Sequence, residues 1–227
     1  MRWIFASREF GLLLPPVFLC LGTGVAWAYH QRPYQDMIAH YSTPTAHLSP
    51  AQRRNVRIAA AKLDGWAIAP HDRMSFNAVV GPRTTARGFS ESNAYMEGRR
   101  TRSVGGGVCL VASTLYAAVQ QTSLPIVTRV AHPVLVRAIP PGRDATVWYG
   151  QADLAFENTY DRPVRVHVTA DDLSCKVELW GTAEPGQRAG LRFAHLRGRK
   201  PGEQLVKVYR HLGDRTVLLS QDTYRSR

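Results

Sequence analysis

Hydrophobic residues recur at helical spacing in two stretches of the chain and alternate with polar residues in most of the remainder. Ser49-Pro50 supplies a helix N-cap and a first-turn proline, and Asp64-Gly65 ends the apolar spacing that follows. A second stretch runs from about Val108 to Gln121. This period predicts two helices. Their apolar positions are Val56, Ala59, Ala60 and Leu63 in the first and Val111, Leu115, Ala118 and Val119 in the second.

A period of two predicts antiparallel strands after the second helix. Between the helices we expect short strands over 66–69 and 74–80 and an irregular segment rich in Arg and Gly over 83–102. The order predicts an α+β fold with the sheet mostly after the second helix. The later strands are expected over 126–136, 145–149, 154–157, 164–168, 175–179 and a closing hairpin over 204–220 around Gly213-Asp214.

The first 28 residues form a separate segment. Arg2 and Arg8 precede an apolar run over 10–28 that ends in Ala26-Trp27-Ala28, a pattern typical of a secretory signal peptide. The run is near the ~20 residues that span a bilayer, so an uncleaved membrane anchor is the alternative, with lipid attachment at Cys20 a minor option. We therefore expect an exported protein of the periplasm or cell envelope. A linker over 29–48 and a single domain over 49–227 would follow.

The net charge of the chain limits the classes of partner that we expect such a protein to bind. Lys and Arg number 29 against 17 Asp and Glu, which gives a formal net charge of +12. Because export makes nucleic acid unsuitable, we expect an anionic envelope polymer such as peptidoglycan, unless the charge reflects only a basic composition. No cofactor is indicated. A metal site is not predicted either, because the sequence has no CxxC and no histidine pair at ligand spacing.

The stretch SVGGGVCLVASTLYAAV, residues 103–119, carries the strongest chemical signal. A cysteine at a helix N-terminus has its thiolate stabilised by unpaired N–H groups and becomes a nucleophile. Gly105, Gly106 and Gly107 would let a substrate carbonyl approach the backbone and offer N–H groups for an oxyanion. Two simpler interpretations stay open. The turn would only cradle an anion, or Cys109 would be a small buried hydrophobic residue.

A nucleophile of this kind needs a base, and His132 is the best candidate. It lies between Val130 and Val134 on the apolar face of an expected strand, although a hydrogen-bonded core histidine would fit there too. If 126–139 pairs with 144–157, Asp153 is a diagonal neighbour of His132 on the same face. Asp144 would then lie about 23 Å away at strand rise. Asp153 is therefore ranked before Asp144 as the orienting acid, with Gln151 as an amide alternative.

Cys175 alternates with Val177 and Leu179, which indicates a buried thiol in a strand. A disulfide between Cys109 and Cys175 is the less favoured alternative for an exported pair.

Five motifs together resemble the VanW-like family over about residues 50–225. They are MSFNAVVGPRTTARGF, GGGVCLVASTLYAAV, IPPGRDATV, ADLAFENTYDRPVRV and QLVKVYRHLGDRTVLLSQDTY. The family takes its name from vancomycin B-type resistance clusters, so the resemblance implies a cell-envelope setting linked to peptidoglycan or glycopeptides. Cys109 and His132 fall on the family's Cys and His positions. Leu110 and Pro133 stand where the family usually has Gln and Ser.

These observations lead to a hypothesis with two alternatives. The chain is a cysteine-dependent amidase, peptidase or transpeptidase acting on peptidoglycan peptides, in a layout analogous to transglutaminase-like and papain-like enzymes. Alternatively it is a non-catalytic module that binds a carboxylate, or an envelope assembly factor. Besides Cys109, His132 and an acid, we expect substrate contacts from the following residues: Gly105, Gly106, Gly107, Arg99, Arg102 and Gln151.

Overall fold

The computed structural model describes residues 34–96, 99–183 and 187–226. The expected signal peptide or anchor over 1–28 lies outside this part of the chain. None of the helices within the described ranges is both long and apolar enough to cross a bilayer.

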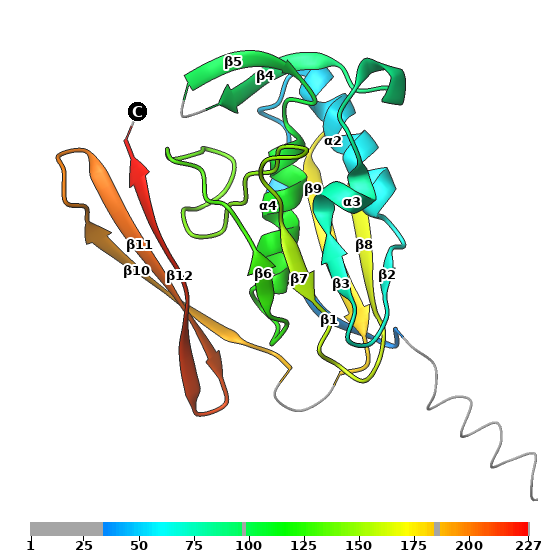
Figure 1. The fold of residues 1–227 in the computed structure, drawn as a ribbon, viewed down its shortest axis with the longest axis vertical. Helices are drawn as coiled ribbons and strands as arrows, with labels where there is room; N and C mark the ends of the chain where they lie inside the picture. Colours follow the sequence, from blue (N-terminus) through cyan, green and yellow to red (C-terminus); the bar gives the residue numbers. More distant parts are fainter. Residues whose placement is uncertain (1–33, 97–98, 184–186, 227) are drawn as a thin grey trace, which may run out of the picture. The chain divides into compact units, whose positions relative to one another are not determined.

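Helices and strands alternate along the first half of the described chain, and strands make up the second half (Figure 1). The helices are α2 (Pro50–Leu63), α3 (Phe76–Val80), the short 3₁₀ helix η1 (Thr85–Arg87) and α4 (Val108–Val119). The strands are β1 (Asp36–Pro44), β2 (Ala67–Ile68), β3 (Arg73–Ser75), β4 (Glu91–Met96), β5 (Arg99–Val104), β6 (Ile126–Thr128), β7 (Ala155–Glu157), β8 (Val164–Ala170), β9 (Ser174–Gly181), β10 (Gly190–Arg197), β11 (Glu203–Leu212) and β12 (Arg215–Arg225).

The main sheet has the strand order β1-β9-β8-β2, and every pair in it is antiparallel. Helices α2 and α4 both pack on this sheet and against each other. The first helix begins and ends where the sequence predicts: Ser49 caps Gln52 in a full capping box, Pro50 opens the first turn, and the helix stops at Leu63. The α+β class is thereby confirmed.

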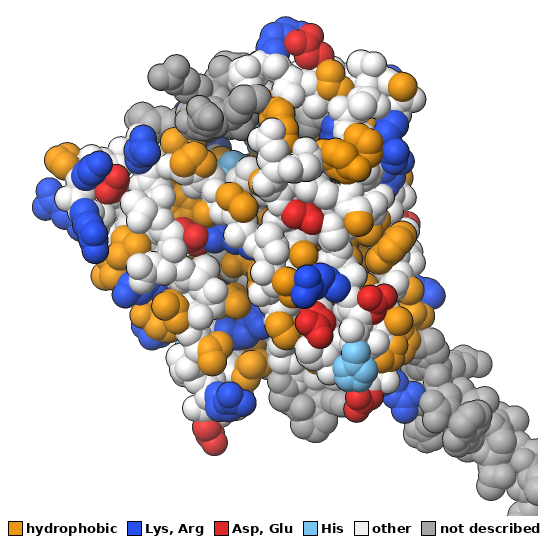
Figure 2. Space-filling view, in the orientation of Figure 1, with side chains coloured by type: hydrophobic (Ala, Val, Ile, Leu, Met, Phe, Trp, Pro, Cys, Tyr) orange, Lys and Arg blue, Asp and Glu red, His pale blue; other side chains and the backbone are white. Residues whose placement is uncertain are grey.

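Three smaller antiparallel sheets accompany the main one: β3-β7-β6, the hairpin β4-β5, and the C-terminal sheet β10-β11-β12. The hairpin of β11 and β12 turns at Gly213-Asp214. Lys and Arg side chains gather over this C-terminal sheet, on the left of the space-filling view (Figure 2). Much of the excess positive charge thus lies outside the main sheet and its two helices.

Helix α4 is surrounded by protein on all sides. Its sequence is apolar around most of its circumference, which is typical of a helix in a core rather than on a surface. Eleven of its 12 residues are buried, and the exception is Cys109. The helix therefore holds its N-terminal cysteine on a support that has little freedom to shift.

Strand β1 lies within the stretch that the sequence assigns to a linker. It pairs with β9 at the edge of the main sheet, so that Thr43 lies opposite Cys175 and Tyr41 lies opposite Val177. A bulge between Met37 and Ala39 breaks its alternation. Thr43 is buried although polar, because Thr114 on α4 donates to its hydroxyl at 2.8 Å. These two features hide the strand from a hydrophobicity pattern.

The strand expected over 74–80 ends at Ser75, which is the N-cap of α3. The Ser75 hydroxyl accepts from the N–H of Ala78 at 3.1 Å, and the Asp153 carboxylate accepts from the N–H of Asn77 at 2.9 Å. Ser75 and the distant Asp153 thus both cap α3, and this capping turns an apolar run that reads as a strand into a helical turn.

Two further strand pairs are absent from the sequence prediction. The segment 83–102, expected to be irregular, contains the hairpin of β4 and β5. Strand β10 pairs with β11 although the sequence shows no strand there. Most of the side chains of β10 are exposed or only partly buried, so no face of it carries the apolar alternation that identifies a half-buried strand.

Two leucines test how much of the stability comes from the main sheet. Leu179 in β9 is 0% exposed, whereas Leu173 in the preceding turn is 74% exposed. We expect Leu179→Ala to lower the free energy of unfolding by about 2–5 kcal/mol, because it leaves a cavity in a close-packed core. Leu173→Ala is expected to stay within about 0.5 kcal/mol. Urea denaturation of both variants measures this, and equal losses would contradict the assigned core.

Candidate active site

The cysteine singled out by the sequence lies at the second residue of α4, with Gly107 at the N-cap. No side chain caps this helix. The N–H of Val108 donates to Gly105 and that of Leu110 to Gly107, at 3.2 and 3.0 Å. The N–H of Gly106 is used as well, because it donates to Ser103 at 3.3 Å. The N–H groups of Cys109 and Gly107 are therefore the ones that suit an oxyanion.

The three glycines are required by the space around the turn. Gly105 and Gly107 have φ values of +87° and +97°, which side chains rarely adopt. A Cβ on Gly105 would lie 2.7 Å from Arg83, and one on Gly106 would lie 2.5 Å from both the Asn93 carbonyl oxygen and the Ser92 hydroxyl. The glycine run thus lets the turn press against β4, which fixes the position of the cysteine that follows.

A buried amide on α2 holds the same turn. The Asn55 side chain is 0% exposed and donates to the Gly106 carbonyl at 3.0 Å and to the Ser90 carbonyl at 2.9 Å. The Ser92 hydroxyl also donates to Gly106, at 3.0 Å. Helix α2, strand β4 and the glycine turn are therefore joined by one polar network, and each of these groups is hydrogen-bonded despite its burial.

The sulfur of Cys109 meets both a backbone amide and an imidazole. The N–H of Val147 lies 3.5 Å from Sγ, and Sγ lies 3.5 Å from the Val147 carbonyl oxygen. Burial alone would raise the pKa of the thiol. The hydrogen bond and charge of His132, the Val147 N–H and the charge of Arg83 outweigh it, so the pKa of Cys109 lies below its ordinary value.

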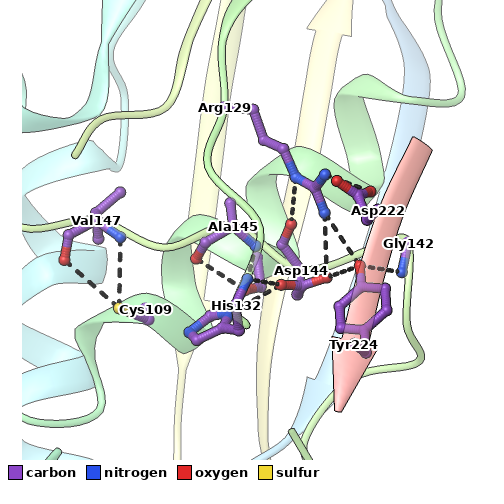
Figure 3. Close-up of polar contacts among 10 residues, drawn as sticks. Cys109, Arg129, His132, Gly142, Asp144, Ala145, Val147, Asp222 and Tyr224 are labelled. Atoms are coloured by element: carbon purple, nitrogen blue, oxygen red, sulfur yellow. Dashed lines mark hydrogen bonds and ion pairs between the residues drawn. The ribbon is translucent and has the colours of Figure 1, made fainter. Parts of the chain in front are cut away.

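The imidazole of His132 lies between Cys109 and a buried carboxylate (Figure 3). Its Nδ1 is 2.8 Å from Oδ2 of Asp144, and its backbone N–H donates to the same oxygen at 2.7 Å. Because Nδ1 meets Asp144, Nε2 is the nitrogen left for the thiol. Burial disfavours the imidazolium, but hydrogen bonds to Asp144 and Cys109 prevail and raise the pKa of His132 to about 9.

The carboxylate that contacts His132 belongs to Asp144 and not to Asp153, which the sequence analysis ranks first. The expected pairing does form at its start, where Thr128 lies opposite Ala155. Two residues later the Val130 carbonyl accepts from the N–H of Thr146 at 2.7 Å. Thr146 is not the residue that the expected register places opposite Val130. Residues 147–153 are therefore not part of the strand pairing, and Asp144 lies beside His132 in place of Asp153.

The residues that leave the ladder form a turn of their own. Trp148 and Ala152 pair across it, and Gly150 adopts φ +79° within it. Gln151, expected as an amide alternative for the base, is exposed in this turn. Asp153 lies beyond it, 2.5 Å from the Ser75 hydroxyl, and it caps α3.

Asp144 is itself 0% exposed and fully engaged. Its Oδ1 accepts from the Tyr224 hydroxyl at 2.6 Å and from Nη2 of Arg129 at 3.1 Å. Burial would raise the pKa of this carboxyl, but the hydrogen bond to His132 and the charge of Arg129 lower it to about 2. Neither Arg129 nor Tyr224 is expected as a partner from the sequence, because the regular pairing of 126–139 with 144–157 does not place Arg129 at Asp144, and Tyr224 lies 80 residues further along the chain.

Cys109 and His132 open onto one pocket of about 670 Å³, a size typical of small-molecule sites. The glycine turn lines it together with parts of β4, β5 and two segments around 136–139 and 147–149. Among the described residues that line it, the basic side chains are His132, His47, Arg83 and Arg137, and none is Asp or Glu. The pocket therefore suits a neutral or anionic ligand.

The remaining expected contacts lie elsewhere or outside the described structure. Arg102 is exposed, pairs with Glu91 at 3.3 Å, and is not among the described residues that line the pocket. The side chain of Arg99 lies outside the part that the structure describes. Cys175 is a free thiol that is 0% exposed, and burial raises its pKa to about 12. In the described ranges no three His, Cys, Asp or Glu residues are grouped to hold a metal.

The family model described as VanW like protein matches residues 51–180, more than half of the chain. The chain belongs to the VanW-like family. The uncharacterized protein YoaR of Bacillus subtilis (strain 168) is similar to this VanW-like chain, at 36% identity over 131 residues. That alignment covers 58% of this chain and 43% of YoaR, so the chain spans less than half of that relative. No solved structure matches.

In this VanW-like chain the matched residues include Cys109, His132 and Asp144, whereas Tyr224 lies beyond them. The family match thus covers Cys109, His132 and Asp144 but not every group that holds them.

The glycine turn yields a stability prediction. We expect Gly106→Ala to lower the free energy of unfolding by about 1–3 kcal/mol, because its methyl group would collide with the backbone of β4. Gly190→Ala is the matched control, since a Cβ there meets only an ordinary contact at 3.6 Å. Chemical denaturation distinguishes the two. If Gly106→Ala and Gly190→Ala have the same free energy of unfolding, the glycine turn is not packed tightly against β4.

The assignment of the acid is tested by titrating His132. In Asp144→Asn we expect the pKa of His132 to fall from about 9 toward its ordinary value of 6.5, because the anionic partner of Nδ1 is lost. Asp153→Asn is expected to leave that pKa unchanged. NMR titration of the labelled imidazole measures both. A larger effect of Asp153→Asn would reverse the assignment.

Proposed function

We propose that this protein is a cysteine-dependent acyl-transfer enzyme of the cell envelope that acts on amide bonds of peptidoglycan peptides. The observation that carries the proposal is that His132 lines the same pocket as Cys109 and is bonded through Nδ1 to the buried Asp144. This is the arrangement of nucleophile, base and orienting acid that acyl transfer requires. The described residues thus offer both a nucleophile and a space for its substrate.

The first half of the reaction uses the negative charge of the Cys109 thiolate and the positive charge of the His132 imidazolium. The Cys109 thiolate attacks the carbonyl carbon of the substrate amide and forms a tetrahedral intermediate. The imidazolium of His132 donates its Nε2 proton to the leaving nitrogen, the C–N bond breaks, and an acyl thioester on Cys109 remains with a free amine. Asp144 keeps Nδ1 protonated and the ring in place throughout.

The second half restores the enzyme. Water, or an amine in a transpeptidase, gives a proton to Nε2 of His132 as it attacks the thioester carbonyl. The C–S bond then breaks and releases an acid or a new amide, which leaves the thiolate and imidazolium as at the start. In both halves the N–H groups of Cys109 and Gly107 would stabilise the oxyanion.

The setting and substrate class rest on charge and family. Membership of the VanW-like family associates the chain with vancomycin resistance and the cell envelope. The net charge of +12 and the basic lining of the pocket favour an anionic polymer whose peptides carry carboxylates. The apolar run over 10–28 is proposed to direct export or anchor the protein at the membrane, with its body in the periplasm or envelope.

The layout of the site supports a comparison with transglutaminase-like and papain-like enzymes. In those enzymes, too, a cysteine begins a helix, and a histidine and a third polar group, an acid or an amide, follow from the strand region. The likeness concerns the order of roles, because no solved structure matches this chain. A non-catalytic module that binds a carboxylate in the same pocket is the alternative, and it would not depend on an ionised thiol.

The alkylation rate of Cys109 by iodoacetamide against pH tests the proposal. We expect reaction below the pH at which ordinary thiols ionise, with a gain of about threefold for each unit by which the pKa is lowered. His132→Ala should move the midpoint up to the ordinary range near 8.5. Mass spectrometry assigns the label to each cysteine, and the buried Cys175 serves as the internal control.

Turnover of peptidoglycan fragments completes the test. Hydrolysis or amine exchange should rise as Cys109 ionises and fall above about pH 9, where His132 loses the proton needed by the leaving amine. Cys109→Ala should abolish turnover and preserve binding of the fragments. If Cys109 is alkylated no faster than a model thiol and its replacement changes nothing, the protein is a binding module.

A further inference from the structure

We infer that the end of strand β12, residues 222–225, is the positioning element of this site, an inference that rests on the proposed function. Asp222 and Tyr224 touch neither the thiol nor the imidazole. They act on Asp144 and Arg129, and the backbone of Arg225 acts on the segment after His132. Strand β12 belongs to the C-terminal sheet, so this sheet completes a site whose three central residues lie elsewhere.

Tyr224 ties the orienting acid to its own backbone. Its hydroxyl donates to Oδ1 of Asp144 at 2.6 Å and accepts from the N–H of Gly142 at 2.8 Å. Tyr224 is 1% exposed, so water does not substitute readily for either bond. One oxygen therefore fixes both the carboxylate and the chain two residues before it.

Asp222 acts through a cation. Its carboxylate pairs with Nη1 of Arg129 at 2.5 Å, and the other arms of Arg129 donate to the carbonyl and the carboxylate of Asp144, at 2.8 and 3.1 Å. The Arg129 side chain is 6% exposed. Because a buried guanidinium needs its anions, Asp222 keeps Arg129 in the orientation that serves Asp144.

The backbone of the same strand holds the histidine segment. The N–H of Arg225 donates to the Pro133 carbonyl at 3.1 Å, and the N–H of Leu135 donates to the Arg225 carbonyl at 3.2 Å. These bonds form a bridge directly after His132. The end of β12 therefore holds both His132 and Asp144, the two partners in the Nδ1–Oδ2 contact. This strand end lies beyond residue 180, where the family match stops.

The physical expectation is a graded weakening of the pair. Tyr224→Phe leaves Asp144 with one donor fewer on Oδ1 and leaves the N–H of Gly142 without its acceptor. The carboxylate then holds Nδ1 less firmly, so the pKa of His132 falls and that of Cys109 rises. The effect should share the direction of Asp144→Asn and be smaller, because the charge is retained.

The experiment compares Tyr224→Phe and Asp222→Asn with Tyr209→Phe in the full chain. Tyr209 lies on the neighbouring strand β11 and stacks on Arg192 at 4.2 Å. We expect the first two variants to lower the NMR midpoint of His132 and to slow alkylation of Cys109 at neutral pH, by about threefold for each unit by which the thiol pKa rises. Tyr209→Phe should match the wild type.

The readouts keep this inference separate from the proposed function. Circular dichroism first establishes that each variant is folded, and Asp222→Asn serves if Tyr224→Phe is not. An unchanged His132 midpoint in a folded variant overturns the positioning role, whatever the wild-type reactivity. Ordinary reactivity of wild-type Cys109 overturns the proposed function, while the His132 midpoint still decides the role of β12.

Discussion

The buried carboxylate of Asp144 is the constraint on which the arrangement of the site depends. A charge removed from water needs partners with good geometry, and Asp144 has four donor contacts from three residues. These partners come from the segment after β6 and from the end of β12. The chain must therefore bring distant parts together around one side chain, and the position of the imidazole beside Cys109 is a result of that requirement.

The two cysteines of the described chain show how the surroundings set reactivity. Cys175 lies among apolar residues of β9, where burial outweighs a hydrogen bond with Thr114 and raises its pKa. Cys109 also suffers from burial, but an imidazole, a backbone N–H and a guanidinium counter it. The same functional group is thus inert in the sheet and ionisable at the start of α4. The difference lies in the partners and not in the depth of burial alone.

The sequence identifies the elements whose signals are local. Ser49, Pro50 and Asp64 mark α2, and the apolar run after the glycines marks α4, because caps and periodicity belong to neighbouring residues. Cys109 and His132 could be chosen from their residue types and positions. What sequence reasoning missed was non-local: β1 is hidden by a bulge, and β10 lacks a buried face.

The choice between the two acids shows the same limit. A regular hairpin places Asp153 beside His132, and its first pair is present at Thr128 and Ala155. The excursion around Gly150 then removes Asp153 and brings Asp144 into contact. Nothing local to Asp144 indicates that Arg129 and Tyr224 will surround it. That arrangement depends on the packing of a sheet more than 40 residues further along the chain.

The burial of α4 on all sides has a bearing on how such proteins diversify. Because the sulfur cannot shift toward a ligand, selectivity has to reside in the surrounding walls, and much of these walls comes from a hairpin and two connecting segments outside the main sheet. Changes in those walls leave the central layers intact. New ligands are therefore accessible to related chains through loop variation, while the reacting atoms stay where they are.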